Sequence, residues 1–188
     1  MKRDITQALV NEHTLILRML AVLERNARRT AEGTYRNYRF YLDAVDFIRN
    51  YADRFHHAKE EDILFEALLK NGMPRNNSPV AAMLLEHDQG RAYVRAMEEA
   101  ANAALAGTPG QDAAIAENAL GYLELLREHI SKEDGILYPL AERLIPEAMR
   151  DAVIDGYRTA EERTPADFTA RYLTLLEEYE AESLQHAA

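Results

Sequence analysis

Cysteine is absent from this 188-residue chain, which excludes disulfides, a thiol nucleophile and a metal site built on thiolates. Glycine and proline are scarce, with 8 and 6 residues, while Ala, Leu, Glu and Arg are common, so the composition favours helix. Positive charge is also in deficit, since 22 basic and 32 acidic residues give a net charge of -10. That deficit argues against a surface that binds nucleic acid or anionic lipid.

Long apolar runs are missing as well. No stretch approaches the roughly 20 apolar residues of a membrane span. The opening sequence, MKRDITQALVNEH, becomes charged again before an apolar stretch of signal-peptide length develops. We therefore expect a soluble, cytoplasmic protein, long enough for one domain with a substantial core.

Turn residues divide most of the chain into four long amphipathic segments. We expect these helices at about residues 4–30, 35–70, 78–106 and 111–143. Gly33 and the sequence NGMP end the first two segments, and Ser78-Pro79 is a typical start for the third. Four such segments with short connections predict an all-α, up-down-up-down four-helix bundle.

Residues 146–188 are predicted to add two C-terminal helices. Pro146 opens the first, and Thr164-Pro165-Ala166-Asp167 has the pattern of a capping box for the second. We therefore divide the chain into a metal-binding bundle at 1–145 and a helical extension at 146–188 that packs on it. The alternatives for the extension are a homodimer contact, a surface for a protein partner, or a lid on a pocket.

Two decapeptides repeat. HHAKEEDILF begins at His56 and HISKEDGILY begins at His129, 73 positions later, and they align without a gap. Glu60 and Glu133 are among the matched positions. A repeat in which histidine and glutamate recur together indicates a shared chemical task.

Each long segment directs one histidine toward its apolar face. Aliphatic residues recur at helical spacing on the same face as each of these histidines, for example Ile16 beside His13 and Leu125 beside His129. The four inward histidines are His13, His56, His87 and His129. One histidine on such a face is usually an ordinary core residue. Four of them, with Glu60 and Glu133 beside two, favour a shared binding site instead. A buried carboxylate without a partner is costly, and a metal centre satisfies all of these groups together.

Protein cations are the other possible partners of the buried carboxylates. Arg91 lies one turn after His87 and could neutralise one of them. Lys59 and Lys132 lie at the margin of the apolar face, and we expect them to extend to water. One arginine cannot satisfy two carboxylates and four imidazoles.

A glutamate directly precedes a histidine at Glu12, Glu86 and Glu128. Neighbouring side chains diverge by roughly 100° on a helix, so we expect these glutamates to be solvated flanks. A hydrogen bond from such a glutamate to a neighbouring helix is the alternative. His186 is assigned no role.

Two positions near His56 need separate treatment. On an α-helical wheel His57 falls roughly 100° and Glu60 roughly 40° from His56, an arc that two metal ions could share. The alternative is that His57 lies on the surface beside the site. Glu60 is preferred to Glu61 as a ligand because of its helical phase and because it matches Glu133 in the repeat. The candidate metal ligands are therefore His13, His56, His57, Glu60, His87, His129 and Glu133.

Nitrogen and oxygen ligands without sulfur suit iron, zinc, manganese or copper. Five histidines and two glutamates are too many for one tetrahedral structural zinc and suit two larger ions. Ferritin-like di-iron proteins use Glu-x-x-His, whereas the order here is His-x-x-x-Glu.

In these residues the chain resembles the hemerythrin-like family, specifically its bacterial branch of HHE cation-binding domains. The resemblance rests on NEHTLIL, HHAKEEDILF, EHDQGR and HISKEDGILYP, and it covers roughly residues 4–145. It implies a non-haem di-iron centre bridged by two carboxylates, in which one iron takes up oxygen reversibly. The family's ligand pattern falls on His13, His56, Glu60, His87, His129 and Glu133.

The third helix departs from the family pattern. Hemerythrins proper carry two histidines one turn apart there, whereas here Arg91 follows His87. We hypothesise that His57 supplies the missing nitrogen. Five histidines, two bridging carboxylates and a bridging oxo or hydroxo group would then leave one position of two octahedral irons open for a diatomic molecule.

The resemblance implies a binding protein that takes up O2 or another small diatomic ligand, or that senses oxygen, redox state or iron. The second hypothesis is a stress or repair protein whose di-iron centre handles nitric oxide, peroxide or iron. The third is a helical bundle with a structural zinc, and zinc or manganese are the alternatives to iron. Neither nucleic acid nor a membrane is an expected partner.

Overall fold

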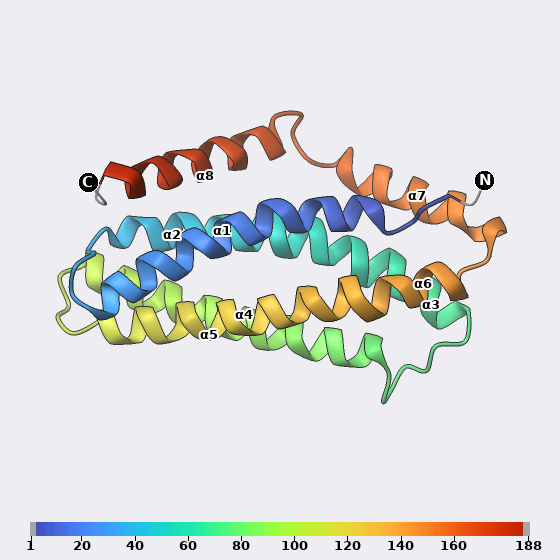
Figure 1. Ribbon diagram of the computed structural model, residues 1–188, viewed down its shortest axis with the longest axis horizontal. Coiled ribbons are helices and arrows are strands. Elements are labelled where there is room, and N and C mark those ends of the chain that lie inside the picture. The colour runs from blue at the N-terminus through green and yellow to red at the C-terminus, as the bar shows by residue number, and fades with distance from the viewer. Residues whose placement is uncertain (1–2, 186–188) are drawn as a thin grey trace.

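The computed structural model describes residues 3–185, and these form a bundle of long helical rods (Figure 1). The first rod is α1 (Gln7–Ala31) and the third is α4 (Pro79–Leu105). Two rods contain π-helical segments, labelled η. The second rod consists of α2 (Tyr38–Phe47), η1 (Ile48–His57), η2 (Glu60–Phe65) and α3 (Glu66–Lys70). The fourth rod consists of α5 (Asp112–Lys132), η3 (Glu133–Leu137) and α6 (Tyr138–Leu144). The predicted all-helical bundle is confirmed.

Two further helices, α7 (Glu147–Glu161) and α8 (Phe168–Gln185), lie along one side of the bundle (Figure 1). α7 contacts η2, and α8 contacts α1. These are the two additional helices expected from the sequence, while the domain boundary at residue 145 stays a prediction. His186 lies outside the described residues.

Local sequence explains where the helices begin and end. The Ser78 side chain accepts a hydrogen bond from the Ala81 backbone N–H, which caps α4 as predicted. Gly33 has a φ of 73° just after α1, a conformation that costs glycine little. The predicted cap of the last helix is wrong, because the Thr164 hydroxyl donates to the Glu161 carbonyl and so closes α7. α8 therefore begins only at Phe168.

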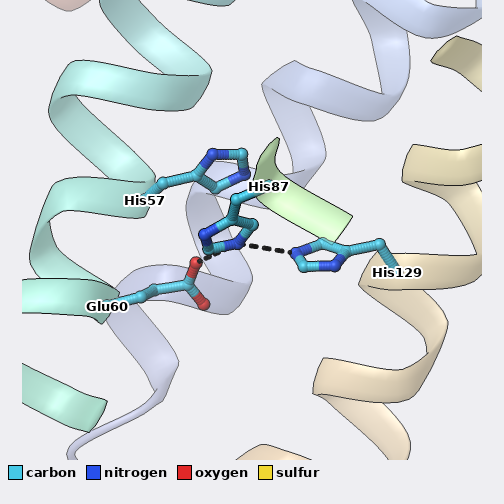
Figure 2. Close-up of side chains that lie close together, drawn as sticks. All are labelled: His57, Glu60, His87 and His129. Atoms are coloured by element: carbon cyan, nitrogen blue, oxygen red, sulfur yellow. Dashed lines mark hydrogen bonds and ion pairs between the residues drawn. The ribbon is translucent and has the colours of Figure 1, made fainter. Parts of the chain in front are cut away.

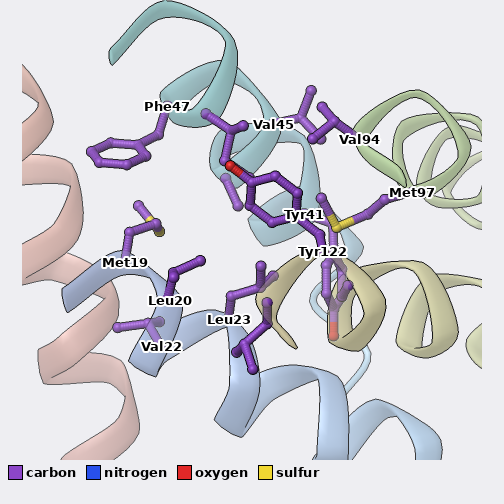
Figure 3. Close-up of a cluster of buried hydrophobic side chains, with 14 of the residues drawn as sticks. Met19, Leu20, Val22, Leu23, Tyr41, Val45, Phe47, Val94, Met97 and Tyr122 are labelled. Atoms are coloured by element: carbon purple, nitrogen blue, oxygen red, sulfur yellow. The ribbon is translucent and has the colours of Figure 1, made fainter. Parts of the chain in front are cut away.

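Two apolar cores lie on either side of a polar layer. Along α1, Leu9 belongs to one core and Ile16 to the other, and His13 stands between them. Along α4, Met83 and Val94 flank His87 in the same way. Figure 3 shows part of the larger core, where the side chains of α1, α2, α4 and α5 meet. The histidines therefore form a buried layer that apolar packing closes on both sides.

Among residues 3–185, no helix combines the length and the apolar character needed to cross a lipid bilayer.

Candidate metal centre

Five histidines meet in the buried layer from all four rods. Each is between 1% and 6% exposed. They come from α1 (His13), the end of η1 (His56 and His57), α4 (His87) and the last turn of α5 (His129).

The π-helical segments explain how adjacent histidines both point inward. A π-helix bonds residue i to i+5, so its turn is wider and successive side chains diverge less than in an α-helix. His56 and His57 close η1 and are both buried. The His57 ring stacks on His87 with centroids 3.8 Å apart. A histidine that α-helical phasing leaves at the edge of the face thus reaches the interior.

The first group of converging ligand atoms is the His57 cluster, which consists of His57, Glu60, His87 and His129. One ligand atom from each residue lies within 4.8 Å of the others. Figure 2 shows these side chains pointing toward one another from η1, η2, α4 and α5. Nε2 of His87 and Nε2 of His129 are 3.0 Å apart.

The second group is the His13 cluster, which consists of His13, His56 and Glu133, again within 4.8 Å. Nε2 of His13 and Nε2 of His56 are 3.0 Å apart. The two clusters contain all seven residues that the sequence proposes as ligands. Their convergence is a structural observation, while their role as ligands stays a prediction.

The two glutamates connect the clusters. Oε1 of Glu133 lies 3.0 Å from Nε2 of His129, and Oε2 lies 3.4 Å from Nε2 of His13. Oε2 of Glu60 lies 3.7 Å from Nε2 of His56 and also 3.7 Å from Nε2 of His87. Each carboxylate therefore faces one imidazole of each cluster.

Each of the five imidazoles of the buried layer has a carboxylate on its other nitrogen. The Nδ1–carboxylate distances are 2.9 Å for His13–Asp134, 2.9 Å for His56–Glu12, 3.3 Å for His57–Asp53, 2.6 Å for His87–Glu61 and 2.9 Å for His129–Glu86. Histidines that bind metals usually donate their other ring N–H to such a group, which fixes the tautomer and the ring orientation. If Nδ1 carries the proton, the Nε2 lone pairs of all five rings face the interior.

The centre is not satisfied by protein groups alone. Four atoms of the centre are buried and have no hydrogen-bond partner in the described part of the chain, namely Nε2 of His57, Oε2 of Glu60 and both carboxylate oxygens of Glu133. The Nε2 atoms that meet at 3.0 Å would also oppose lone pairs to each other. A cation between them relieves both defects, so the residues present fit a metal.

Electrostatics lead to the same conclusion. Burial and the charge of Glu133 raise the pKa of Glu60 well above its usual value. Burial opposes ionisation of Glu133 too, but the nearby His129 and His13 rings hold its pKa below the usual range. Burial also lowers the pKa of His57 to about 4, so that ring is neutral at pH 7 and free to act as a ligand. Without a cation the two glutamates cannot both ionise cheaply.

The basic residues bind the outer carboxylates rather than the inner pair. Arg91 lies 2.7 Å from Asp53 and 2.8 Å from Glu61, so it neutralises groups that hold His57 and His87. The alternative in which Arg91 neutralises one of the two inner carboxylates is therefore wrong.

Two expectations for the lysines and the flanking glutamates also need correction. Lys59 does not extend to water, since its side chain is 0% exposed and bonded to Glu12. Lys132 is 37% exposed and bonds Glu86. Glu12 and Glu86 are thus hydrogen-bond partners of His56 and His129, not solvated flanks, because each lies on the rod next to its histidine.

The sequence contains a signal for these missed partners. Glu12 directly precedes His13, and Glu86 directly precedes His87. Each of these glutamates binds another histidine of the same cluster, His56 or His129, which lies on a neighbouring rod. Of the three glutamates in this position, Glu128 is exposed as expected. Asp134 and Glu61 stand directly after Glu133 and Glu60, at equivalent points of the repeat.

Residues 4–141 match the family described as the hemerythrin HHE cation binding domain. The match covers more than half of the chain. This chain belongs to the hemerythrin HHE cation-binding family. The comparisons with curated proteins and with solved structures returned no match. The family implies a metal site with histidine and glutamate ligands, and the buried clusters of this HHE domain fit one.

A cavity of about 240 Å³ borders the centre of the HHE domain. His57, His87 and His129 line it, and so do exposed residues such as Arg54, so it reaches the surface. The His57 cluster is therefore accessible to a small molecule from one side.

Proposed function

We propose that this HHE domain holds a non-haem di-iron centre and uses it to take up O2, or to sense oxygen, redox state or iron. Three histidines of the His57 cluster would bind one ion, and the two histidines of the His13 cluster would bind the other. Glu60 and Glu133 would be shared. When bound, a reduced iron pair supplies reversible uptake of a diatomic molecule.

The position of the two carboxylates carries this proposal. Glu133 and Glu60 each face an imidazole from both clusters, at 3.0 to 3.7 Å. Carboxylates set between two groups of imidazoles suit two neighbouring cations and not one isolated tetrahedral zinc. Ligand sets of imidazole and carboxylate are the kind that iron accepts.

The surrounding residues prepare the centre before any metal arrives. Outer carboxylates hold all five imidazoles with Nε2 inward. Tyr138 donates to Oε1 of Glu60 at 2.6 Å, and its hydroxyl lies 3.4 Å from Nε2 of His13. The apolar cores on both sides limit the access of bulk water. Because the His13 cluster offers fewer nitrogen ligands, we assign the open position for a diatomic molecule to that ion.

The test is metal analysis combined with an optical spectrum recorded anaerobically, then in air, then after oxygen is removed again. We expect about two irons per chain and a visible band that appears with oxygen and disappears without it. Irreversible bleaching, or turnover with peroxide or nitric oxide, would support the stress-protein hypothesis instead. One zinc or less per chain from cells would support the structural-zinc hypothesis.

A further inference from the structure

The cavity beside the His57 cluster is larger than a diatomic molecule requires. A water molecule occupies about 30 Å³ of liquid, so about 240 Å³ has room for roughly eight groups of that size. The open position assigned above also belongs to the other ion, in the His13 cluster. Uptake of O2 therefore does not explain this space.

A glycine creates the space. Gly90 follows His87 by three positions on α4, as Ile16 follows His13 on α1. Ile16 is 2% exposed and fills its side of the core, whereas Gly90 lines the cavity. A Cβ atom at Gly90 would lie 3.4 Å from the Tyr122 ring, which is an ordinary van der Waals contact. Packing therefore does not exclude a side chain at this position. In a helix interior glycine costs roughly 0.5–1 kcal/mol relative to alanine.

One buried hydroxyl in the cavity wall has no hydrogen-bond partner among the described residues. Tyr122 is 2% exposed and lines the cavity, and within residues 3–185 its buried hydroxyl has no hydrogen-bond partner. Burial raises the pKa of Tyr122, so the hydroxyl keeps its proton and can donate. The surrounding wall is aliphatic, formed by Ile48, Val94, Leu125 and Leu126.

Four arginines line the same cavity, although the chain as a whole is acidic. Two of them are neutralised, since Arg49 binds Glu98 at 2.5 Å and Arg91 binds Asp53. Arg54 and Arg95 are exposed and, among the described residues, have no carboxylate partner. The outer part of the cavity therefore carries uncompensated positive charge.

We propose that this cavity binds a short aliphatic carboxylate with an oxygen acceptor near the far end of its chain, such as an oxo acid of about six carbons. The carboxylate binds Arg54 and Arg95, and the alkyl chain packs on the aliphatic wall. The far oxygen accepts the Tyr122 hydroxyl hydrogen after a shift of the side chains that bury this hydroxyl. This inference goes beyond the proposed function and does not depend on iron or oxygen.

The experiment is calorimetric titration of the full chain with 5-oxohexanoate and with hexanoate, before and after treatment with a chelator. We expect one binding site and a preference of about five-fold for 5-oxohexanoate, the value of one neutral hydrogen bond. The Tyr122→Phe variant should bind both probes equally, because it removes only the donor.

The arginines are tested with the double variant Arg54→Gln/Arg95→Gln. We expect both carboxylates to bind at least about ten-fold more weakly, since charged hydrogen bonds are stronger than neutral ones. The matched control is Arg36→Gln/Arg75→Gln, two exposed arginines outside the cavity, which should change nothing.

Gly90→Val places three carbon atoms in the cavity and should weaken the binding of both probes, while circular dichroism shows the helices intact. Failure of both probes to bind either form of the protein would overturn the proposal. So would equal binding of the uncharged analogue 2-hexanone, or unchanged affinity in the arginine variant. Each of these results can occur whether or not the protein takes up oxygen, so the two proposals fail separately.

Discussion

The His13 cluster and the His57 cluster are built from matching parts of the sequence. A shift of 73 or 74 positions converts the residues of the first into residues of the second. The matched pairs are His13/His87, His56/His129 and Glu133/Glu60. The repeat noticed in the decapeptides is therefore an approximate symmetry of the centre, in which each half of the bundle contributes to both clusters.

The symmetry extends to the groups that hold the imidazoles. Glu12 bonds both His56 and Lys59, and Glu86 bonds both His129 and Lys132. Asp134 and Glu61 are likewise equivalent partners of His13 and His87. The two halves of the bundle therefore position and orient their histidine rings through equivalent partners.

Three differences break the symmetry. His57 has Ile130 as its counterpart, so the His57 cluster has one more imidazole. Tyr138 corresponds to Phe65, so Glu60 receives a phenol hydrogen bond that Phe65 cannot give to Glu133. Lys59 is fully buried and also binds Glu161 of α7, at 3.0 Å, whereas Lys132 is partly exposed. The repeat supplies the framework of the site, and these three differences make the two clusters unequal.

The shared carboxylates should give the largest effect of any substitution. Glu60→Ala and Glu133→Ala should each lose both metal ions, because each carboxylate faces both clusters. Metal per chain, measured after gel filtration, checks this, with the exposed Glu128→Ala as control. If either variant retained a full complement, the claim that the carboxylates join the two positions would be wrong.

His57→Ile makes the two nitrogen sets equal by copying Ile130 into the matching position. We expect one ion to lose more affinity than the 10- to 100-fold that removal of an outer hydrogen-bond partner costs. The other ion should be retained at near its original affinity. A competition titration with a chelator that resolves two binding steps measures both values. Two unchanged steps would show that His57 is not a ligand.

The fold and the candidate site differ in how far the sequence predicts them. The rods follow from hydrophobic period and from turn residues such as Gly33 and Ser78, which act locally. The inward direction of His13, His56, His87 and His129 follows from the same period, and burial confirms it.

The features that a helical wheel failed to predict depend on contacts between rods and on changes of helix type. Ile136 stands seven positions after His129, which would place both on one face of a regular α-helix, but its side chain is 57% exposed because η3 changes the phase of the fourth rod. The buried Lys59 side chain donates a hydrogen bond to Glu161, which is 102 positions away in the chain. No local pattern can reveal such a pair, because a helical wheel describes one rod at a time.

Glu12→Gln and Glu86→Gln compare the two halves directly. Each removes one charge from the partner of one imidazole, so we expect a loss of about 10- to 100-fold in metal affinity. The loss should fall on different ions, on the His13 cluster for Glu12 and on the His57 cluster for Glu86. The two-step chelator titration distinguishes them, and Glu128→Gln serves as control. Losses on the same ion would contradict the assignment of His56 and His129 to separate clusters.

Glu161→Gln should give the smallest effect and the most selective one. Glu161 touches Lys59, which bonds Glu12, which in turn holds His56, so three contacts link α7 to the His13 cluster. Loss of one charge at that distance should weaken only the His13-cluster ion, by about two- to five-fold, less than the loss of a direct partner. The neighbouring exposed Glu162→Gln is the matched control. Equal weakening of both ions would mean that Glu161 acts through general stability, since the Lys132 side has no equivalent helix in the described chain. A selective effect would show that the C-terminal extension adjusts one half of an otherwise repeated centre.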